Sequence, residues 1–150
     1  MNWFYHVVAI VLVSGVLLAC GENTTATEYI NNAKRYLAEG ESTAATIELK
    51  NALKSEADNI EARWLLGKIY YDLNDMPSAD KELRRARQLG VPVEQVFPLL
   101  AQAFLKQSKL AELQALSAEG LGGEPLATLL SAQGLGRLAQ GELAEAGELI

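Results

Sequence analysis

Apolar residues recur every three or four positions through most of the chain, which is the spacing of one face of an α-helix. The stretch 60–73 shows this spacing clearly, with Leu65, Leu66, Ile69 and Tyr70 on one side. Turn residues, chiefly glycine, asparagine and aspartate, interrupt the pattern at short intervals. The pattern therefore predicts an all-α protein made of short helices joined by tight turns.

The start and end of the first helix carry specific signals. Thr25 and Glu28 have the spacing of a capping box, in which a side chain and a backbone N–H satisfy each other in both directions. This motif predicts a first helix from near Tyr29 to Ala38. Gly40 then follows, and glycine is the residue that most readily takes the left-handed conformation at a helix C-terminus.

Similar signals place the next three helices. The second helix opens at Glu41 or Ser42, and Asn59 is the predicted N-cap of a third helix over 60–73. Pro77 falls in the first turn of a fourth helix, where its missing N–H leaves no hydrogen bond unmade. That fourth helix is expected to close near Gly90.

A longer period lies over the helical one, because residue types recur 34 positions later. Small residues would let antiparallel helices approach closely, and large ones would fill the space beside them. The pairs at this offset are Ala33 with Gly67, Tyr36 with Tyr70, Gly40 with Asn74, Ala45 with Ala79, Leu49 with Leu83, and Ala52 with Ala86.

Two weaker units follow. In the third, Ala101 and Phe104 keep the period, but Leu113 and Ser117 replace the small and large residues of the second helix. A glycine-rich break at 120–123 comes next, and Pro125 is expected to restart a helix. The fourth unit keeps the internal spacing of the third, 33 positions further along the chain, at Gly134, Gly141, Ala146 and Ile150. We expect its two helices to be joined at Gly141.

The 34-residue period with this order of small, aromatic and turn residues resembles the tetratricopeptide repeat (TPR). The resemblance implies a helix-turn-helix solenoid, in which antiparallel helix pairs form a right-handed superhelix. The repeat region is predicted over 28–150, with units near 26–59, 60–93, 94–126 (degenerate) and 127–150 (incomplete). A solenoid ends in a polar capping helix, and none follows the fourth unit. We therefore expect these residues to be the N-terminal part of a longer array, or the product of a truncated gene. The repeat-packing residues are Ala33, Tyr36, Ala45, Ala52, Gly67, Tyr70, Ala79, Ala86, Ala101, Phe104, Gly134 and Ala146.

Composition excludes several functional classes. The 150 residues are 49% hydrophobic and 21% charged, as in globular proteins, and a net charge of −6 argues against a broad nucleic-acid-binding face. The single histidine, His6, and the single cysteine, Cys20, precede the repeats. The repeats therefore lack the residues for a Ser/His/Asp triad, a Cys/His pair or a histidine metal site. We expect no catalytic residue, metal or cofactor.

The N-terminus carries a separate signal. Residues 3–19 form an uncharged apolar run, which suits a signal peptide better than a full membrane span. The residues 17–20, Leu-Leu-Ala-Cys, resemble the bacterial lipobox. This resemblance implies cleavage after residues 1–19, lipid on Cys20, and a tether over 20–27. Glu22 in place of aspartate favours the outer membrane over the inner one. The alternative is an uncleaved signal anchor, because Leu18 is bulky for its position and residues 1–6 contain no lysine or arginine.

Together with the lipobox, the segments 28–30, 44–53, 61–70 and 78–86 resemble the TPR-repeat lipoprotein of PEP-CTERM/exosortase systems in Gram-negative bacteria. The resemblance runs to about Gln107 and is looser beyond it. It implies a lipid-anchored scaffold on the periplasmic side of the envelope that serves protein sorting or exopolysaccharide export. The partners it implies are a protein or peptide, the membrane through Cys20, and exopolysaccharide machinery, and it brings no reaction.

TPR arrays bind partners mainly in the groove lined by the first helix of each unit. Lysines in this groove could pair with the carboxylates of a peptide or acidic polymer, and aromatic residues could supply flat apolar contact area. Solvated lysines and an aromatic residue that packs between repeats are the alternatives. The groove candidates are Lys34, Trp64, Lys68, Tyr71, Asp72, Gln102 and Lys106, with Ile30, Leu37 and Leu105 as apolar neighbours.

Two functions compete with the protein-binding scaffold. A glycosidase needs two carboxylates facing each other across a cleft, but Glu61 and Asp72 lie about three turns apart on one predicted helix, which excludes them as such a pair. Non-catalytic glycan binding rests on Trp64 and Tyr71 alone. A basic cluster on the fourth helix is interpreted as a solvated convex surface: Lys81, Arg84, Arg85 and Arg87.

Overall fold

The computed structural model describes residues 24–148, with side chains up to Gly141. The predicted signal peptide, Cys20 and the first part of the tether therefore lie outside the described residues. Within the described part every regular element is a helix. In chain order the helices are α2 (Ala26–Ala38), α3 (Ser42–Ser55), α4 (Ile60–Asp72), α5 (Met76–Gln88), α6 (Val93–Lys106), α7 (Leu110–Gln114) and α8 (Gly123–Glu148).

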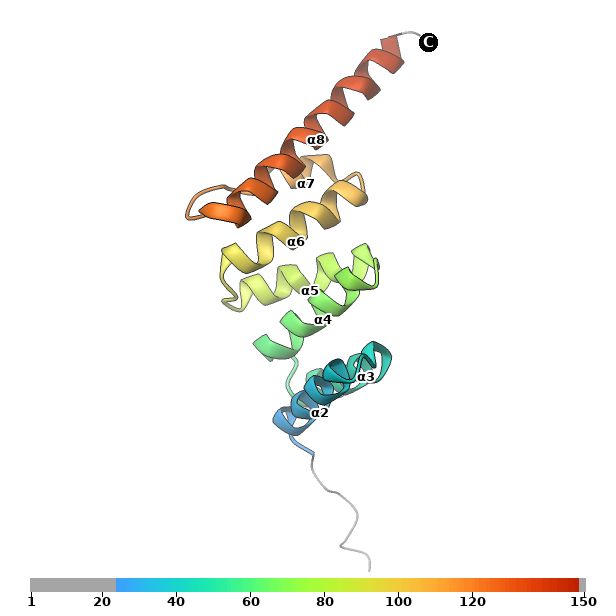
Figure 1. Cartoon of the computed structure of the whole chain (residues 1–150), viewed down its shortest axis with the longest axis vertical. Coiled ribbons are helices and arrows are strands. Elements are labelled where there is room, and N and C mark those ends of the chain that lie inside the picture. The colour runs from blue at the N-terminus through green and yellow to red at the C-terminus, as the bar shows by residue number, and fades with distance from the viewer. Residues whose placement is uncertain (1–23, 149–150) are drawn as a thin grey trace, which may run out of the picture.

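The helices stack in chain order into an elongated molecule, with α2 at one end and α8 at the other (Figure 1). From α2 to α7 each helix packs on the one that follows it, and α8 packs on α6 and α7. The pairs α2–α3, α4–α5 and α6–α7 correspond to the first three predicted units. The prediction of an all-α, TPR-like helical solenoid is confirmed.

The predicted helix signals act as expected. Thr25 and Glu28 form the capping box, with the Glu28 N–H donating to Thr25 Oγ1 (3.3 Å) and the Thr25 N–H to Glu28 Oε2 (2.8 Å). The Asn59 side chain accepts a hydrogen bond from the Ala62 N–H (3.0 Å). Pro77 lies in the first turn of α5. The capping box starts α2 at residue 26, three residues before the predicted start.

The turn inside each of the first three units uses a left-handed residue at the same repeat position. Gly40, Asn74 and Ser108 have φ values of 80°, 60° and 56°. Asparagine tolerates this conformation better than most residues, whereas a serine there carries backbone strain. The turn geometry is therefore preserved at the 34-residue period even though the residue type changes.

The interior consists of two clusters that share one side chain. The first joins α2, α3 and α4, the second joins α5 to α8, and the partly buried Tyr70 packs against both. The small repeat residues are fully buried: Ala33, Ala45, Ala52, Ala79, Ala86 and Ala101. Of the aromatic repeat residues, Phe104 is buried while Tyr36 and Tyr70 are partly exposed. This difference places the tyrosines at the edges of the interior.

The structure departs from the predicted units after residue 106. The helix α7 has only five residues, and α8 is one continuous helix of 26 residues that passes through Gly141, where a turn was expected. The flanking leucine, alanine, glutamine and glutamate are strong helix formers, and a single glycine costs only about 1 kcal/mol relative to alanine. A helix through Gly141 is therefore locally favourable.

The packing glycine of α8 is also displaced by two residues. A Cβ atom added to Gly134 would meet nothing within 4 Å, whereas one added to Gly136 would lie 3.0 Å from Leu113 Cδ2. Gly136 thus marks the close contact between α8 and α7. Ala146 belongs to the part of α8 whose side chains lie outside the described residues.

Gly67 provides a direct test of close helix packing. A Cβ atom there would lie 2.7 Å from Leu83 Cδ2, and Leu83 is fully buried. We expect Gly67→Ala to lower the free energy of unfolding by about 1–2 kcal/mol, because overpacking outweighs the gain in helix propensity. The measurement is urea unfolding followed by circular dichroism.

The matched control is Gly134→Ala, which adds the same methyl group to a helix where nothing opposes it. It should leave stability unchanged or raise it by up to about 1 kcal/mol. The double variant Gly67→Ala with Leu83→Ala should lose less stability than the sum of the losses from Gly67→Ala and Leu83→Ala, because removing the leucine side chain relieves the overpacking. Equal effects of the two glycine substitutions would contradict the packing role of Gly67.

Candidate functional site

The first helices of the first three units, α2, α4 and α6, form one surface, which we call the first-helix face. The ion pair between Lys34 Nζ and Glu61 Oε1 (2.7 Å) links α2 to α4. Lys106 on α6 donates a hydrogen bond to Asn74 Oδ1, just after α4 (2.8 Å). These contacts show that side chains from three units share this surface.

Two aromatic rings on α4 each lie beneath a lysine. The Lys68 Nζ atom is 5.7 Å from the centroid of the Trp64 ring, and the Lys106 Nζ atom is 5.8 Å from that of Tyr71. Both rings are half-buried and both ammonium groups are exposed. At such distances the negative ring face attracts the cation. The result is a mixed aromatic and cationic patch formed by α4 and α6.

The other predicted groove residues lie around this patch with different roles. Asp72 is exposed on α4, and Gln102 is half-buried on α6. Ile30 differs from its prediction, since it is 4% exposed and belongs to the interior, because α2 turns it toward α3 and α4. The lysines are not a uniform row, because Lys34 has a carboxylate partner whereas Lys68 and Lys106 lie over rings.

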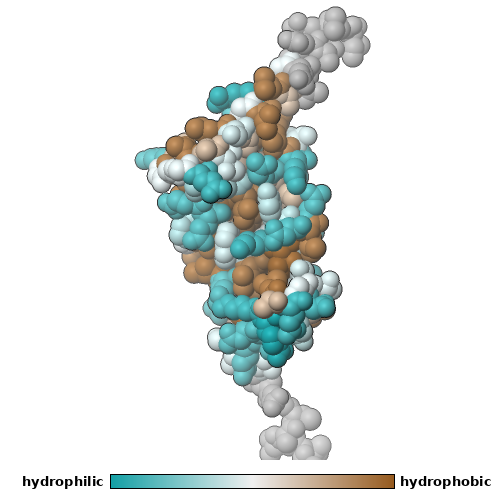
Figure 2. Space-filling model, viewed as in Figure 1, coloured by the Kyte–Doolittle hydropathy of each residue, from teal (hydrophilic) through white to brown (hydrophobic). Residues whose placement is uncertain are grey.

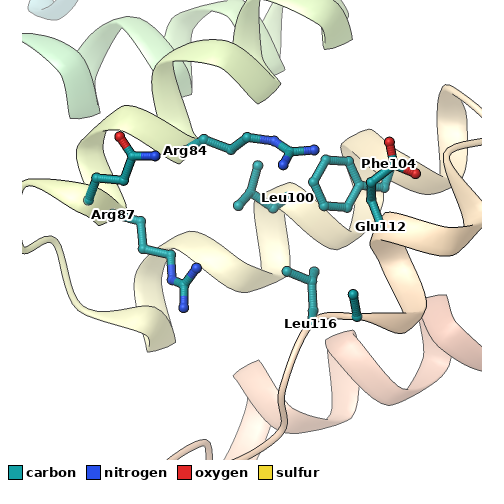
Figure 3. Close-up of a pocket in the computed structure, with 8 residues that line it drawn as sticks. Arg84, Arg87, Leu100, Phe104, Glu112 and Leu116 are labelled. Atoms are coloured by element: carbon teal, nitrogen blue, oxygen red, sulfur yellow. The ribbon is translucent and has the colours of Figure 1, made fainter.

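A concave region lies between α5 and α7, with α6 as its floor (Figure 3). We call it the arginine cleft. Its volume is about 240 Å³. It exists because α7 is only five residues long and covers little of α6. The lining residues are Arg84, Arg87, Gln88, Leu100, Phe104, Glu112, Ala115 and Leu116.

Both arginines of the cleft lie over phenylalanine rings. The Arg84 Cζ atom is 4.7 Å from the centroid of Phe104, and the Arg87 Cζ atom is 4.7 Å from that of Phe97. Arg84 also donates from Nε to Asp80 Oδ1. The sequence pattern predicts a solvated convex surface for these arginines, and both are exposed. The pattern does not predict the cleft, because ring contacts between helices are tertiary. The loss of repeat pattern near 117–123 does indicate that the second helix of this unit is short.

The same helix holds two buried carboxylates. The side chain of Asp80 pairs with Arg84 and with Lys109 Nζ (2.6 Å), and that of Glu82 pairs with Arg63 Nη1 (2.6 Å). Each carboxylate is 7% exposed, and its desolvation is offset by these cations, with Lys81 Nζ also 3.6 Å from Glu82 Oε1. These ion pairs join α5 to α4 and to the residue before α7, which makes them structural contacts.

Exposed leucines gather on α8, where Figure 2 shows apolar surface toward the C-terminal end of the stack. They are Leu130, Leu135 and Leu138, with exposures of 51%, 54% and 66%. None of the helices in residues 24–148 combines the length and apolar content that crossing a bilayer requires. In the same residues no group of three or more aspartates and glutamates is arranged to hold a metal ion.

Comparison with known proteins shows a similarity that covers most of the chain. The chain is 30% identical to DnaJ homolog subfamily C member 3 of Gallus gallus over 112 residues, which are 75% of this chain. The matched region is 22% of the relative, so the chain spans about a fifth of that protein's length. No protein-family model matches the chain, and no solved structure matches it.

The lysines of the first-helix face should contribute much less to the free energy of unfolding than the structural ion pairs do. We expect Lys68→Ala and Lys106→Ala each to change the free energy of unfolding by less than about 1 kcal/mol, because both ammonium groups are exposed. Glu82→Ala should cost about 2–3 kcal/mol, since it leaves the Arg63 guanidinium without its buried partner. Urea unfolding measures all three. A loss from Lys68→Ala as large as that from Glu82→Ala would give the lysine a structural role instead.

Proposed function

We propose that the chain is a lipid-anchored periplasmic scaffold that binds protein partners on its first-helix face. The observation that carries this proposal is the patch of Trp64, Lys68, Tyr71 and Lys106, in which half-buried rings and exposed ammonium groups alternate. Aromatic residues with adjacent cations are typical of interface anchors. The ammonium groups favour a segment with carboxylates. The TPR-like solenoid supports the same use, because such arrays present extended binding surfaces.

The proposed pathway rests on the resemblance of the sequence to the TPR-repeat lipoprotein of PEP-CTERM/exosortase systems. Lipid on Cys20 would hold the stack at the membrane, and the array would act in PEP-CTERM/exosortase-linked protein sorting or exopolysaccharide export. The outer membrane is the favoured location because Glu22 follows the cysteine at the second position. No reaction is part of this role, so the chain would organise other proteins.

Non-catalytic glycan binding during exopolysaccharide secretion is the second candidate. It would use the flat rings of Trp64 and Tyr71. The geometry favours proteins over neutral glycans, because Lys68 and Lys106 already lie over these ring faces. A sugar would have to displace the lysines before it could stack.

Photocrosslinking in cells tests the first-helix face. We expect p-benzoylphenylalanine in place of Tyr71 to give a discrete protein adduct that weakens with Trp64→Ala or Lys68→Ala. The matched control places the crosslinker at Ile47, which is 55% exposed on the second helix α3. Equal adducts from both positions would contradict a specific face. Calorimetric binding of exopolysaccharide without any protein adduct would favour the glycan-binding candidate.

Metabolic labelling tests the anchor. We expect a clickable palmitate to label the wild-type chain in the membrane fraction and the label to disappear in Cys20→Ser, because the thiol is the acceptor implied by the lipobox. An exposed serine-to-alanine change, Ser108→Ala, serves as the control and should keep the label. An unlabelled wild type in the membrane fraction would indicate an uncleaved signal anchor.

A further inference from the structure

We propose that the arginine cleft is a second binding site, which takes a peptide segment of a protein partner with a carboxylate side chain next to a large apolar one. This site lies between second helices and is separate from the first-helix face. It therefore goes beyond the proposed function. The site consists of the two arginines, the apolar surface beside them and the single carboxylate of the opposite wall.

The two guanidinium groups are held in place before any ligand arrives. Each lies 4.7 Å from a phenylalanine ring centroid, and Arg84 is further fixed by buried Asp80. The Arg87 side chain makes no hydrogen bond or ion pair with any of the described residues, so its guanidinium N–H donors are free for a ligand. A planar guanidinium with free donors matches a carboxylate in a bidentate geometry.

The charge of the cleft favours an anion in an otherwise acidic chain. Among the described residues, the three cations Arg84, Arg87 and the nearby Lys109 are set against the two carboxylates found at the cleft, Asp80 and Glu112. Asp80 is already shared between Arg84 and Lys109. The charge of Arg87 is therefore the one that remains without a partner.

Glu112 distinguishes between the two anions that a peptide could present, a carboxylate and a phosphate. It lies on the opposite wall, contributed by α7 (Figure 3). A doubly charged phosphate would be repelled more strongly by Glu112 than a singly charged carboxylate. The same oxygen atoms can accept a backbone N–H of a bound peptide. Because Arg84 is already paired with Asp80, a single negative charge balances Arg87, and the second charge of a phosphate would face Glu112 without a cation of its own. The site therefore matches an aspartate or glutamate side chain better than a phosphorylated one.

The remaining surface of the cleft is apolar and favours a ligand that has a large apolar side chain next to its carboxylate. Leu100 and Phe104 form the floor and are almost fully covered, while Ala115 and Leu116 leave apolar surface open on the α7 side. The methylene groups of the arginines add to this surface. At about 240 Å³ the cleft is smaller than typical small-molecule sites of roughly 300–1,000 Å³. It accommodates one or two side chains of a longer segment.

Peptide pools test the proposal. End-blocked, fluorescein-labelled nine-residue pools carry a fixed central pair with randomised flanks, and the pairs are Asp-Phe, Asn-Phe, Asp-Ser and phosphoserine-Phe. Fluorescence anisotropy with the 150-residue chain should show the Asp-Phe pool binding about tenfold or more tightly than the other three. Glu112→Gln should narrow the gap between the Asp-Phe and phosphoserine-Phe pools.

Matched variants distinguish the cleft from general charge. Arg87→Gln should weaken binding of the Asp-Phe pool about tenfold. Arg85→Gln removes the same charge from the same helix, but this guanidinium bonds to Asp58, so binding should stay within about twofold. Trp64→Ala should have no effect, which separates this site from the first-helix face. Circular dichroism of each variant shows whether the fold is kept.

Peptide pools that bind equally or not at all would overturn the proposal, and so would equal losses of affinity from Arg85→Gln and Arg87→Gln. In NMR titrations with the Asp-Phe pool, we expect amide chemical shift changes at Leu100, Glu112 and Leu116. Changes on α4 in their place would also overturn the proposal. A tighter phosphoserine-Phe pool would overturn the choice of a carboxylate and indicate a phosphopeptide site. None of these outcomes changes the result expected from crosslinking at Tyr71, so the cleft and the first-helix face are tested separately.

Discussion

The close approach of neighbouring helices at small residues is the constraint on which the rest of the structure depends. Alanines at the repeat positions are fully buried, and Gly67 leaves less than a methyl group of space beside Leu83. With the helices this close, the leucines of one helix fill the grooves of the next. The orientation of each first helix, and so the position of Trp64 and Tyr71, follows from these contacts.

Charge is distributed unevenly over this framework. The two buried carboxylates of α5 are neutralised by cations from α4, α5 and the residue before α7. The remaining cations of the same helix include Arg87, whose charge is supported by a ring and not by a carboxylate. An acidic protein thus presents a local cationic surface, because its own acids on α5 are already used in the interior.

The 34-residue period and the capping residues were enough to predict the first four helices closely. Thr25, Asn59 and Pro77 act locally, so their effects can be read without the rest of the fold. The later helices were harder, because Gly141 reads equally well as a turn or as a tolerated glycine in a helix. The first-helix residues could be placed by period alone. The stacking of Arg84 on Phe104 could not, because it joins residues 20 positions apart through the packing of α5 on α6.

The division of the interior into two clusters with one shared tyrosine has a mechanical consequence. Cooperative unfolding requires that interior contacts be continuous. Here α4 contributes buried residues to the first cluster, and its partly buried Trp64, Tyr70 and Tyr71 pack against the second. A load applied from the N-terminal end would therefore reach α2 and α3 first. These two helices contact the first cluster alone, so they could detach as one unit while α4 stays packed on α5 and the arginine cleft stays folded. The stack can thus yield at one end without losing its shape at the other.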